Sequence, residues 1–176
     1  MKKLLLVFLL IPATLFSLQM HGQIYINFEG VEGDTKIKDK GTEVMALTLG
    51  SENATSIGSA TTGASSGKVQ FADLSFTKVR GKSSNVLQQK LYSGTHVPKV
   101  VINYYKAGSA EPFMIITLTT VYITKVDLAL TGGEPPTETI TLKYGAISFE
   151  DNYGTDPAGR PIKPTSSWNV MTNKAQ

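Results

Sequence analysis

Two long runs of strand-forming residues in the second half of the chain restrict the fold more than any other feature. Residues 113–130 consist almost entirely of β-branched, aromatic and other apolar residues, and residues 137–149 alternate apolar and polar side chains. A period of two with this composition is typical of β-strands and not of helices. The first run is longer than an ordinary strand, which predicts a bent strand or two strands in series.

The apolar phase of the second run changes once. Residues 140–144 place Ile140, Leu142 and Tyr144 on one face, whereas Ile147 and Phe149 follow in the opposite phase. Gly145 lies between the two sets, and an isolated glycine inside a strand often marks a bulge. The sequence therefore predicts a β-bulge at this glycine.

Shorter strand-like segments complete an all-β pattern with one short helix. Strands are expected at residues 24–28, 44–49, 69–71, 74–79 and 100–105, with a last short strand at 168–170. The helix is expected at residues 83–92, with Ser83 or Ser84 as its cap, and Gly94 would end it. Its apolar face would hold Val86, Leu87 and Leu91. Since no βαβ alternation occurs, a barrel or a sandwich is favoured.

The first 22 residues have the three-part layout of a secretory signal peptide. Lys2 and Lys3 precede an apolar run over residues 4–16, and polar sequence follows from Gln19. The apolar run is shorter than the ~20 residues that a spanning helix needs. Cleavage is expected near Gly22, which leaves residues 23–176 as one exported domain without a membrane span. A buried N-terminal helix and an uncleaved membrane anchor are the alternative interpretations.

Charge and composition argue against several function classes. Loss of the two signal lysines from the 17 basic residues leaves 15, against 14 acidic ones. The basic residues are scattered, so a nucleic-acid partner is not expected. The absence of cysteine excludes disulfides, thiol catalysis and a lipoprotein anchor. The charged stretch over residues 32–40 is expected to be a solvated turn or sheet edge.

No constellation of residues predicts an active site, a cofactor site or a metal site. His96 is the one histidine retained after cleavage, and it lies in a turn without a nucleophile motif. Glu150 and Asp151 are neighbours on a strand, so they point to opposite faces. Gly67-Lys68 is followed by valine and does not complete a phosphate-binding loop. We expect a protein that is not an enzyme.

The segment from Ser51 to Gly67 is the first candidate for a functional element. It is rich in glycine, serine and threonine, and Ile57 is its one large apolar residue. A stretch of this length and composition is expected to be a flexible loop that orders only against another subunit. The candidate assembly residues are Ser51, Ile57, Gly58, Gly63 and Gly67.

Several motifs, taken in chain order, resemble the haemolysin-coregulated protein (Hcp) family of type VI secretion. They are Lys-Val-Gln-Phe-Ala-Asp-Leu-Ser-Phe-Thr-Lys at 68–78, Ser-Ser-Asn-Val-Leu at 83–87 and Ser-Gly-Thr-His-Val-Pro at 93–98. Further matches occur at residues 30–34, 106–108, 115–118, 138–142 and 168–170. The residues that carry the family motif are Asp73, Leu74, Ser75, Phe76, Thr77, His96 and Trp168.

The resemblance implies a two-sheet β-barrel with one flanking helix. It also implies hexameric rings that stack into the inner tube of a contractile injector, carry effectors in the lumen and meet spike or sheath proteins. In this family the extended loop reaches a neighbouring subunit or ring. The outward threonines Thr119, Thr139 and Thr141 would suit polar packing between subunits.

The signal-like N-terminus departs from the family, whose tube proteins assemble in the cytoplasm and usually carry no signal peptide. We therefore expect this chain in the periplasm or outside the cell. The alternative function is an exported, monomeric β-sandwich module that binds a glycan or a protein ligand.

Overall fold

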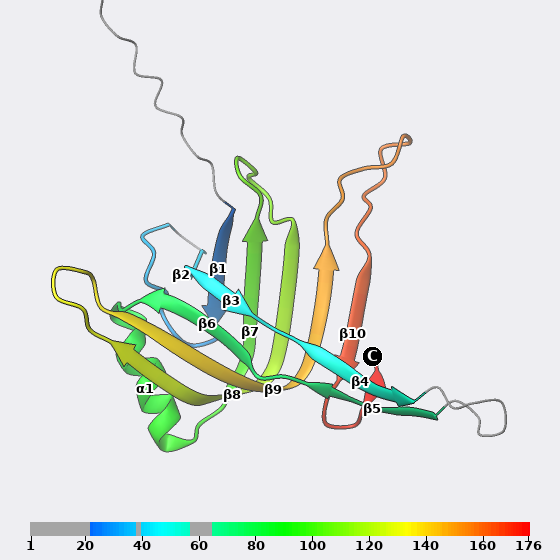
Figure 1. Ribbon diagram of the computed structural model, residues 1–176. Helices are drawn as coiled ribbons and strands as arrows, with labels where there is room; N and C mark the ends of the chain where they lie inside the picture. The colour runs from blue at the N-terminus through cyan, green and yellow to red at the C-terminus, as the bar shows by residue number, and fades with distance from the viewer. Residues whose placement is uncertain (1–21, 38–39, 57–64) are drawn as a thin grey trace, which may run out of the picture.

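The computed structural model describes residues 22–37, 40–56 and 65–176 (Figure 1). In this part of the chain it forms one helix and eleven strands. The strands are β1 (Gln23–Phe28), β2 (Thr42–Val44), β3 (Ala46–Thr48), β4 (Ser51–Ser56), β5 (Ser65–Phe71), β6 (Leu74–Val79), β7 (Val97–Tyr105), β8 (Met114–Ala129), β9 (Thr137–Asp151), β10 (Thr165–Asn169) and β11 (Lys174–Ala175). The helix is α1 (Lys82–Ser93).

Antiparallel pairing carries the sheet around into a barrel. β1 pairs with β7, β7 with β8, β8 with β9, β9 with β6, and β6 with β3. β2 pairs with β1 and closes the circuit, because β2 and β3 flank Met45 and act as one broken strand. The Met45 backbone N–H donates to the Thr77 carbonyl at 2.8 Å. The expected all-β class, single helix and barrel are confirmed, whereas the one strand expected at residues 44–49 is broken at Met45.

β8 and β9 are the long bent strands that the sequence predicts (Figure 1). The N-terminal half of β9 pairs with β6, and its C-terminal half pairs with β10. The last short strand is also confirmed, since β10 contains Trp168 and pairs with both β9 and β11. One pair of strands thus belongs to both layers of the barrel.

The bend lies on one row of residues that crosses three strands. The register places Pro98 of β7, Thr120 of β8 and Gly145 of β9 beside one another. Thr120 has φ 53°, in the left-handed region. A Cβ on Gly145 would lie 3.1 Å from the Thr120 Cβ, so the glycine leaves room for this turn of the neighbouring strand.

The side-chain phase changes across this row, as the sequence predicts, but the shift in strand register lies elsewhere. In β8 both Leu118 and Val121 are buried, and in β7 both Val97 and Val100 are buried. The register shift between β8 and β9 falls between Ile123 and Lys125, so the prediction of a bulge at Gly145 is wrong. A phase change in one strand cannot tell which of the paired strands carries the irregular residue.

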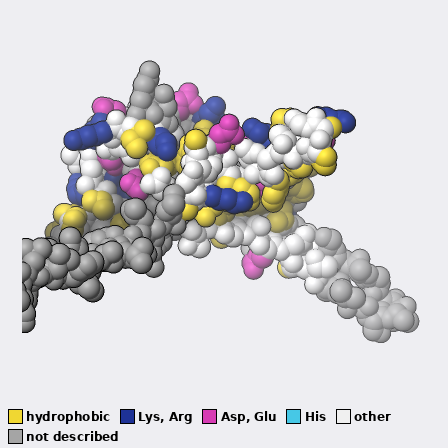
Figure 2. All heavy atoms as spheres, turned by 90° about the horizontal axis from the view of Figure 1, so that it is seen from above, with side chains coloured by type: hydrophobic (Ala, Val, Ile, Leu, Met, Phe, Trp, Pro, Cys, Tyr) yellow, Lys and Arg dark blue, Asp and Glu magenta, His cyan; other side chains and the backbone are white. Residues whose placement is uncertain are grey.

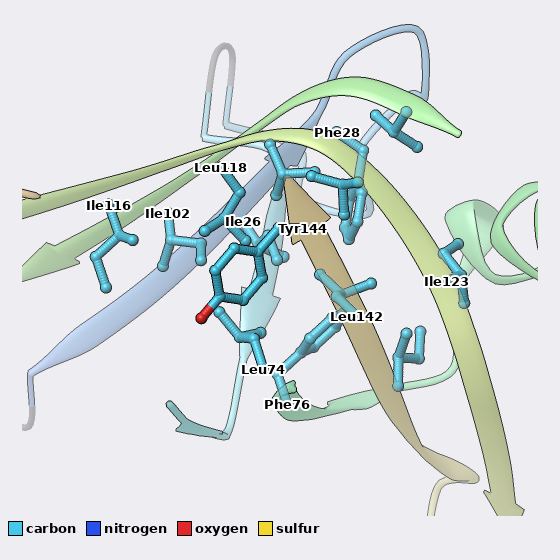
Figure 3. Close-up of a cluster of buried hydrophobic side chains, with 14 of the residues drawn as sticks. Ile26, Phe28, Leu74, Phe76, Ile102, Ile116, Leu118, Ile123, Leu142 and Tyr144 are labelled. Carbon is cyan, nitrogen blue, oxygen red and sulfur yellow. The ribbon is translucent and has the colours of Figure 1, made fainter. Parts of the chain in front are cut away.

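Side chains from both layers fill the barrel (Figure 3). Leu74, Leu118 and Leu142 are fully buried, and the Phe28 and Phe76 rings lie 6.0 Å apart. Complete burial of such a side chain stabilises the fold by about 1.5–3 kcal/mol. The labelled side chains in Figure 3 are Ile26, Phe28, Leu74, Phe76, Ile102, Ile116, Leu118, Ile123, Leu142 and Tyr144.

α1 begins and ends within one residue of its expected bounds, and Gly94 closes it at φ 63°. Leu87 is buried and Leu91 packs on the core, but Val86 is 41% exposed, so its assignment to the apolar face is wrong. The N-cap residue is Gly81 and neither serine, but Ser84 takes part in the cap, because its hydroxyl accepts the Gly81 N–H at 3.0 Å. In the described ranges, no helix has the length and apolar character needed to cross a bilayer.

Candidate assembly site

A β-hairpin stands where the sequence predicts a flexible loop. β4 and β5 pair with each other and continue the β3–β6 pair beyond the barrel wall (Figure 1). Ser51 begins β4 and Gly67 lies in β5, whereas Ile57, Gly58 and Gly63 lie outside the described residues. The loop prediction is wrong for the described part. β4 and β5 extend the paired strands β3 and β6, and this backbone pairing orders the small polar residues although they form no apolar cluster.

Gly67 has a steric role in this hairpin. The register shifts between Asn53 and Thr55, which places Gly67 and Lys68 opposite Ala54 as a bulge. A Cβ at Gly67 would lie 2.3 Å from the Ala54 carbonyl oxygen. The bulge therefore requires glycine, and it bends the hairpin near its middle.

The base of the hairpin is held against the barrel. The Ala72 N–H donates to the Gly50 carbonyl at 2.9 Å, and the Tyr144 hydroxyl donates to the Ala72 carbonyl at 3.3 Å. The Phe71 ring meets the Tyr144 ring edge-on, with centroids 6.3 Å apart. Burial and the charge of Asp73 raise the pKa of Tyr144 to about 12.

An open apolar groove of about 260 Å³ lies between this base and the β9–β10 edge. Figure 2 shows hydrophobic side chains gathered beside the base of the projecting hairpin. Trp168 is half-buried, and its indole Nε1 is buried with no hydrogen-bond acceptor among the residues described. The groove is lined by Val69, Phe71, Ile147, Phe149, Ser166, Ser167 and Trp168.

A second apolar surface lies at the opposite end of the β6–β9–β8 layer (Figure 1). Val79 and Ala129 both face Thr137 across the sheet. Val79 is 46% exposed, and Leu130, which follows Ala129, is 72% exposed. Leu128 is also exposed. We call Val79, Leu128 and Leu130 the tip patch; the sequence analysis missed it, although apolar residues directly before Gly132-Gly133 were the available signal.

A buried ionic cluster lies beside the tip patch and fixes α1 to the barrel. Lys78 and Glu138 face each other across β6 and β9, and both are buried. The Lys78 Nζ lies 2.9 Å from the Glu138 Oε1, and the Ser84 hydroxyl donates to the same oxygen at 2.6 Å. Arg80 Nη1 reaches the other carboxylate oxygen at 3.2 Å. Every charge in the cluster thus has a partner, as burial requires.

Asp34 joins this cluster and occupies the N-terminus of α1. Its carboxylate accepts hydrogen bonds from Lys78 Nζ at 2.8 Å and from the N–H and hydroxyl of Ser83, both at 2.7 Å. Burial raises the pKa of Asp34, but the hydrogen bonds from Lys78 and Ser83 outweigh it and leave the pKa below its usual range. The prediction that residues 32–40 are only a solvated turn is therefore wrong at Asp34.

The family-motif residues do not form one site. Leu74 and Phe76 are buried in the core, and Ser75 and Thr77 point to the other side of β6. Asp73 is exposed, with an oxygen 4.0 Å from Lys143 Nζ. His96 is also exposed, beside the Tyr122 ring at 5.7 Å between centroids. Trp168 is the motif residue that the structure brings to the groove.

The three threonines expected on the outer surface differ in exposure. Thr119 is exposed, whereas Thr139 and Thr141 are half-buried. The Thr139 hydroxyl lies 3.1 Å from the Thr77 hydroxyl, so it contributes to pairing within the subunit. In the ranges that the structure describes, no three His, Cys, Asp or Glu side chains gather as metal ligands.

Comparisons of sequence identify the family. The family described as "Type VI secretion system effector, Hcp" matches residues 25–150. The protein hcp1 of Pseudomonas aeruginosa is 35% identical over 112 residues, which cover 60% of this chain and 68% of that protein.

Comparisons of structure agree. A structure described as a type six secretion system protein superposes with a TM-score of 0.77 at 27% identity, over 88% of this chain and 99% of that one. Hcp1 from Salmonella typhimurium has the same fold, with a TM-score of 0.71 at 20% identity over 89% of this chain and 100% of its own. The chain belongs to the Hcp family, the tube-type structural proteins of type VI secretion systems.

Proposed function

We propose that the mature chain assembles into hexameric rings that stack into a tube and carry effectors in the lumen. The single observation that carries this proposal is the pair of unlike apolar surfaces at opposite ends of the subunit, the groove at the hairpin base and the tip patch. A subunit with two different contact surfaces joins its copies head to tail, and such contacts close into a ring when the rotation fits.

The hairpin β4–β5 is the second assembly element in this proposal. It projects from the barrel, and its described side chains from Ser51 to Thr55 are exposed. A projecting ribbon with little apolar surface of its own gains most from pairing with another subunit or ring. Effectors inside the tube, and spike or sheath proteins at its end and surface, are the further partners.

Export by the general pathway is a separate part of the proposal. It rests on the signal-like sequence of residues 1–22, of which residues 1–21 lie outside the described part. Cleavage would release residues 23–176 into the periplasm or beyond. Recovery of the full chain, with Met1 intact, from the cytoplasm of the producing cell would contradict this part alone.

Shortening the hairpin tests assembly. Deletion of residues 54–65 removes the outer part of the ribbon and leaves the base contacts of Ala72 with Gly50 and Tyr144 in place. We expect the variant to fold, with the β-sheet circular dichroism of the wild type, and to lose rings and stacked tubes in negative-stain electron microscopy. The matched control is Tyr92→Asp, which places a charge on an exposed residue of α1 and leaves the rings intact.

If the deletion variant still forms rings like those of the wild type, the hairpin is excluded as an assembly element. A wild-type protein that shows single particles of monomer size, without rings, would favour the monomeric binding module.

A further inference from the structure

We propose that the mature protein begins with a pyroglutamate formed on Gln23. This covalent modification rests on the proposed removal of residues 1–22, because cleavage after Gly22 makes Gln23 the first residue. An N-terminal glutamine can close a five-membered lactam, since its α-nitrogen and its side-chain amide carbon are the two ends of one short chain. Among the ordinary amino acids, glutamate alone shares this ability.

The structure leaves Gln23 free to react. Gln23 is the first residue of β1, and its side chain is exposed, so no core packing holds the amide away from the α-nitrogen. Gly22 lies against the neighbouring Tyr104, where a Cβ would come 2.7 Å from the hydroxyl oxygen. β1 therefore starts at the residue that cleavage would expose.

The barrel tolerates the five-membered lactam at Gln23. The Glu29 N–H donates to the Lys99 carbonyl at 3.0 Å, and hydrogen-bonded pairs alternate along an antiparallel ladder. In this register Gln23 and Tyr105 form the last such pair of β1. The lactam closes on the α-nitrogen as proline does, and the first residue of a strand is a position that accepts proline. Cyclisation thus affects only the hydrogen-bonded pair at the end of β1, Gln23 and Tyr105.

Charges around the strand end favour the neutral lactam over a free α-ammonium group. Lys106 directly follows Tyr105, the partner of Gln23, and Lys40 places its ammonium 4.3 Å from the centre of the Tyr105 ring. The acidic Glu43 faces Tyr25, two residues further into the sheet. A free amino terminus would add a further positive charge at this end of the sheet, whereas the lactam carries no charge.

The reaction needs no oxidant, reductant or cofactor. The uncharged α-amine attacks the side-chain amide carbon of Gln23, a carbon–nitrogen bond forms, and the bond from that carbon to its own NH₂ group breaks. The amide nitrogen leaves as ammonia with the proton that the amine gives up. The product is lighter by one ammonia, and its α-nitrogen is now a lactam nitrogen and no longer a primary amine.

The test uses the full chain, purified from the envelope or medium of cells that produce it, and measures intact mass and N-terminal sequence. We expect the mass of residues 23–176 less one ammonia, no signal in Edman sequencing, and a sequence starting at Ile24 after digestion with pyroglutamate aminopeptidase. The control is Gln23→Asn, which keeps an amide but cannot form the five-membered ring. Its Edman sequence should be readable without the digestion, with asparagine in the first cycle.

The outcomes separate this inference from the proposed export. An unblocked Gln23 at the full mass of residues 23–176 overturns the pyroglutamate and leaves cleavage standing. A protein that starts at Met1, or at any residue other than Gln23, overturns the cleavage site and the modification together.

Discussion

At the scale of single residues, Lys78 is the most consequential position outside the apolar core. It is fully buried and is the cation that Asp34 and Glu138 share. Removal of one partner from a buried ion pair leaves the other charge without compensation, and this is far costlier than loss of an exposed pair. The cluster thus holds α1, the loop before β2 and the β6–β9 pair in one arrangement.

Lys78→Met should lower the free energy of unfolding by about 3–5 kcal/mol, because Glu138 and Asp34 remain in place without the shared ammonium. Urea denaturation of the mature protein measures this. Lys125→Met is the matched control: Lys125 pairs with Asp127 at the surface, and its loss should cost about 0.5 kcal/mol or less. Equal effects of the two substitutions would show that the buried cluster is energetically unimportant.

Asp34 makes the free energy of unfolding depend on pH in the acidic range. Its pKa in the folded state lies below the ordinary value of 3.8, so its ionised form stabilises the fold fully at pH values above 3.8. This contribution is lost as the pH falls through the folded-state pKa. Asp34→Asn should therefore be less stable than the wild type at neutral pH, and the gap in unfolding free energy should narrow on acidification. A gap that stays constant down to pH about 3 would contradict this reading of Asp34.

At the scale of elements, the bend of β7, β8 and β9 turns one sheet into two layers. Thr120 carries the left-handed backbone of this row, a conformation that costs a β-branched residue about 1–2 kcal/mol. Its neighbour Gly145 is closed in by Thr120 and Met171. The groove and the tip patch lie on opposite sides of this bend, so the bend sets their relative direction.

Thr120→Gly should raise the free energy of unfolding by about 1 kcal/mol, because glycine adopts a positive φ without steric cost. Thr119→Gly is the control, since the same change next to the bend offers no such relief and weakens the strand. Thermal unfolding followed by circular dichroism compares the two variants. A loss of stability in Thr120→Gly as large as that in Thr119→Gly would contradict the strain at this residue.

Much of the element pattern was predictable from the sequence, because period-two alternation depends on local contact with the core. The long strands β8 and β9, the helix and its end at Gly94 follow from that pattern. The hairpin β4–β5 could not be predicted in this way, because its order comes from the strands that it continues and not from its own side chains. The ionic cluster left a readable signal: Lys78 shares its phase with Leu74 and Phe76, and a charge at an inward position implies a buried partner.

The position of Asp34 had no such signal. Asp34 and Ser83 are 49 residues apart, and only the closed barrel brings the loop before β2 to the start of α1. The tip patch left a partial signal in the apolar residues before Gly132-Gly133, but their exposure depends on where the neighbouring strands stop. Contacts between distant segments therefore mark the limit of what the alternation pattern predicts.

At the scale of the whole molecule, the two apolar surfaces give the subunit a direction. The hairpin base and the end of the sheet that carries the tip patch lie at opposite ends of the subunit (Figure 1), and the groove lies at the hairpin base, an arrangement that suits head-to-tail contacts between copies. In the proposed ring, both surfaces of every subunit would be buried, whereas a monomer leaves Leu130 and the groove in water. We therefore propose that the mature protein is a ring, and not a monomer, in solution.

Sedimentation of residues 23–176 at micromolar concentration tests this claim most directly. We expect one main species at six times the monomer mass. We also expect Leu130→Asp to sediment as a folded monomer, because it places a charge on a residue that is 72% exposed in the subunit and would be covered in the proposed ring. A wild-type protein that stays a single monomeric species up to its solubility limit would contradict the account.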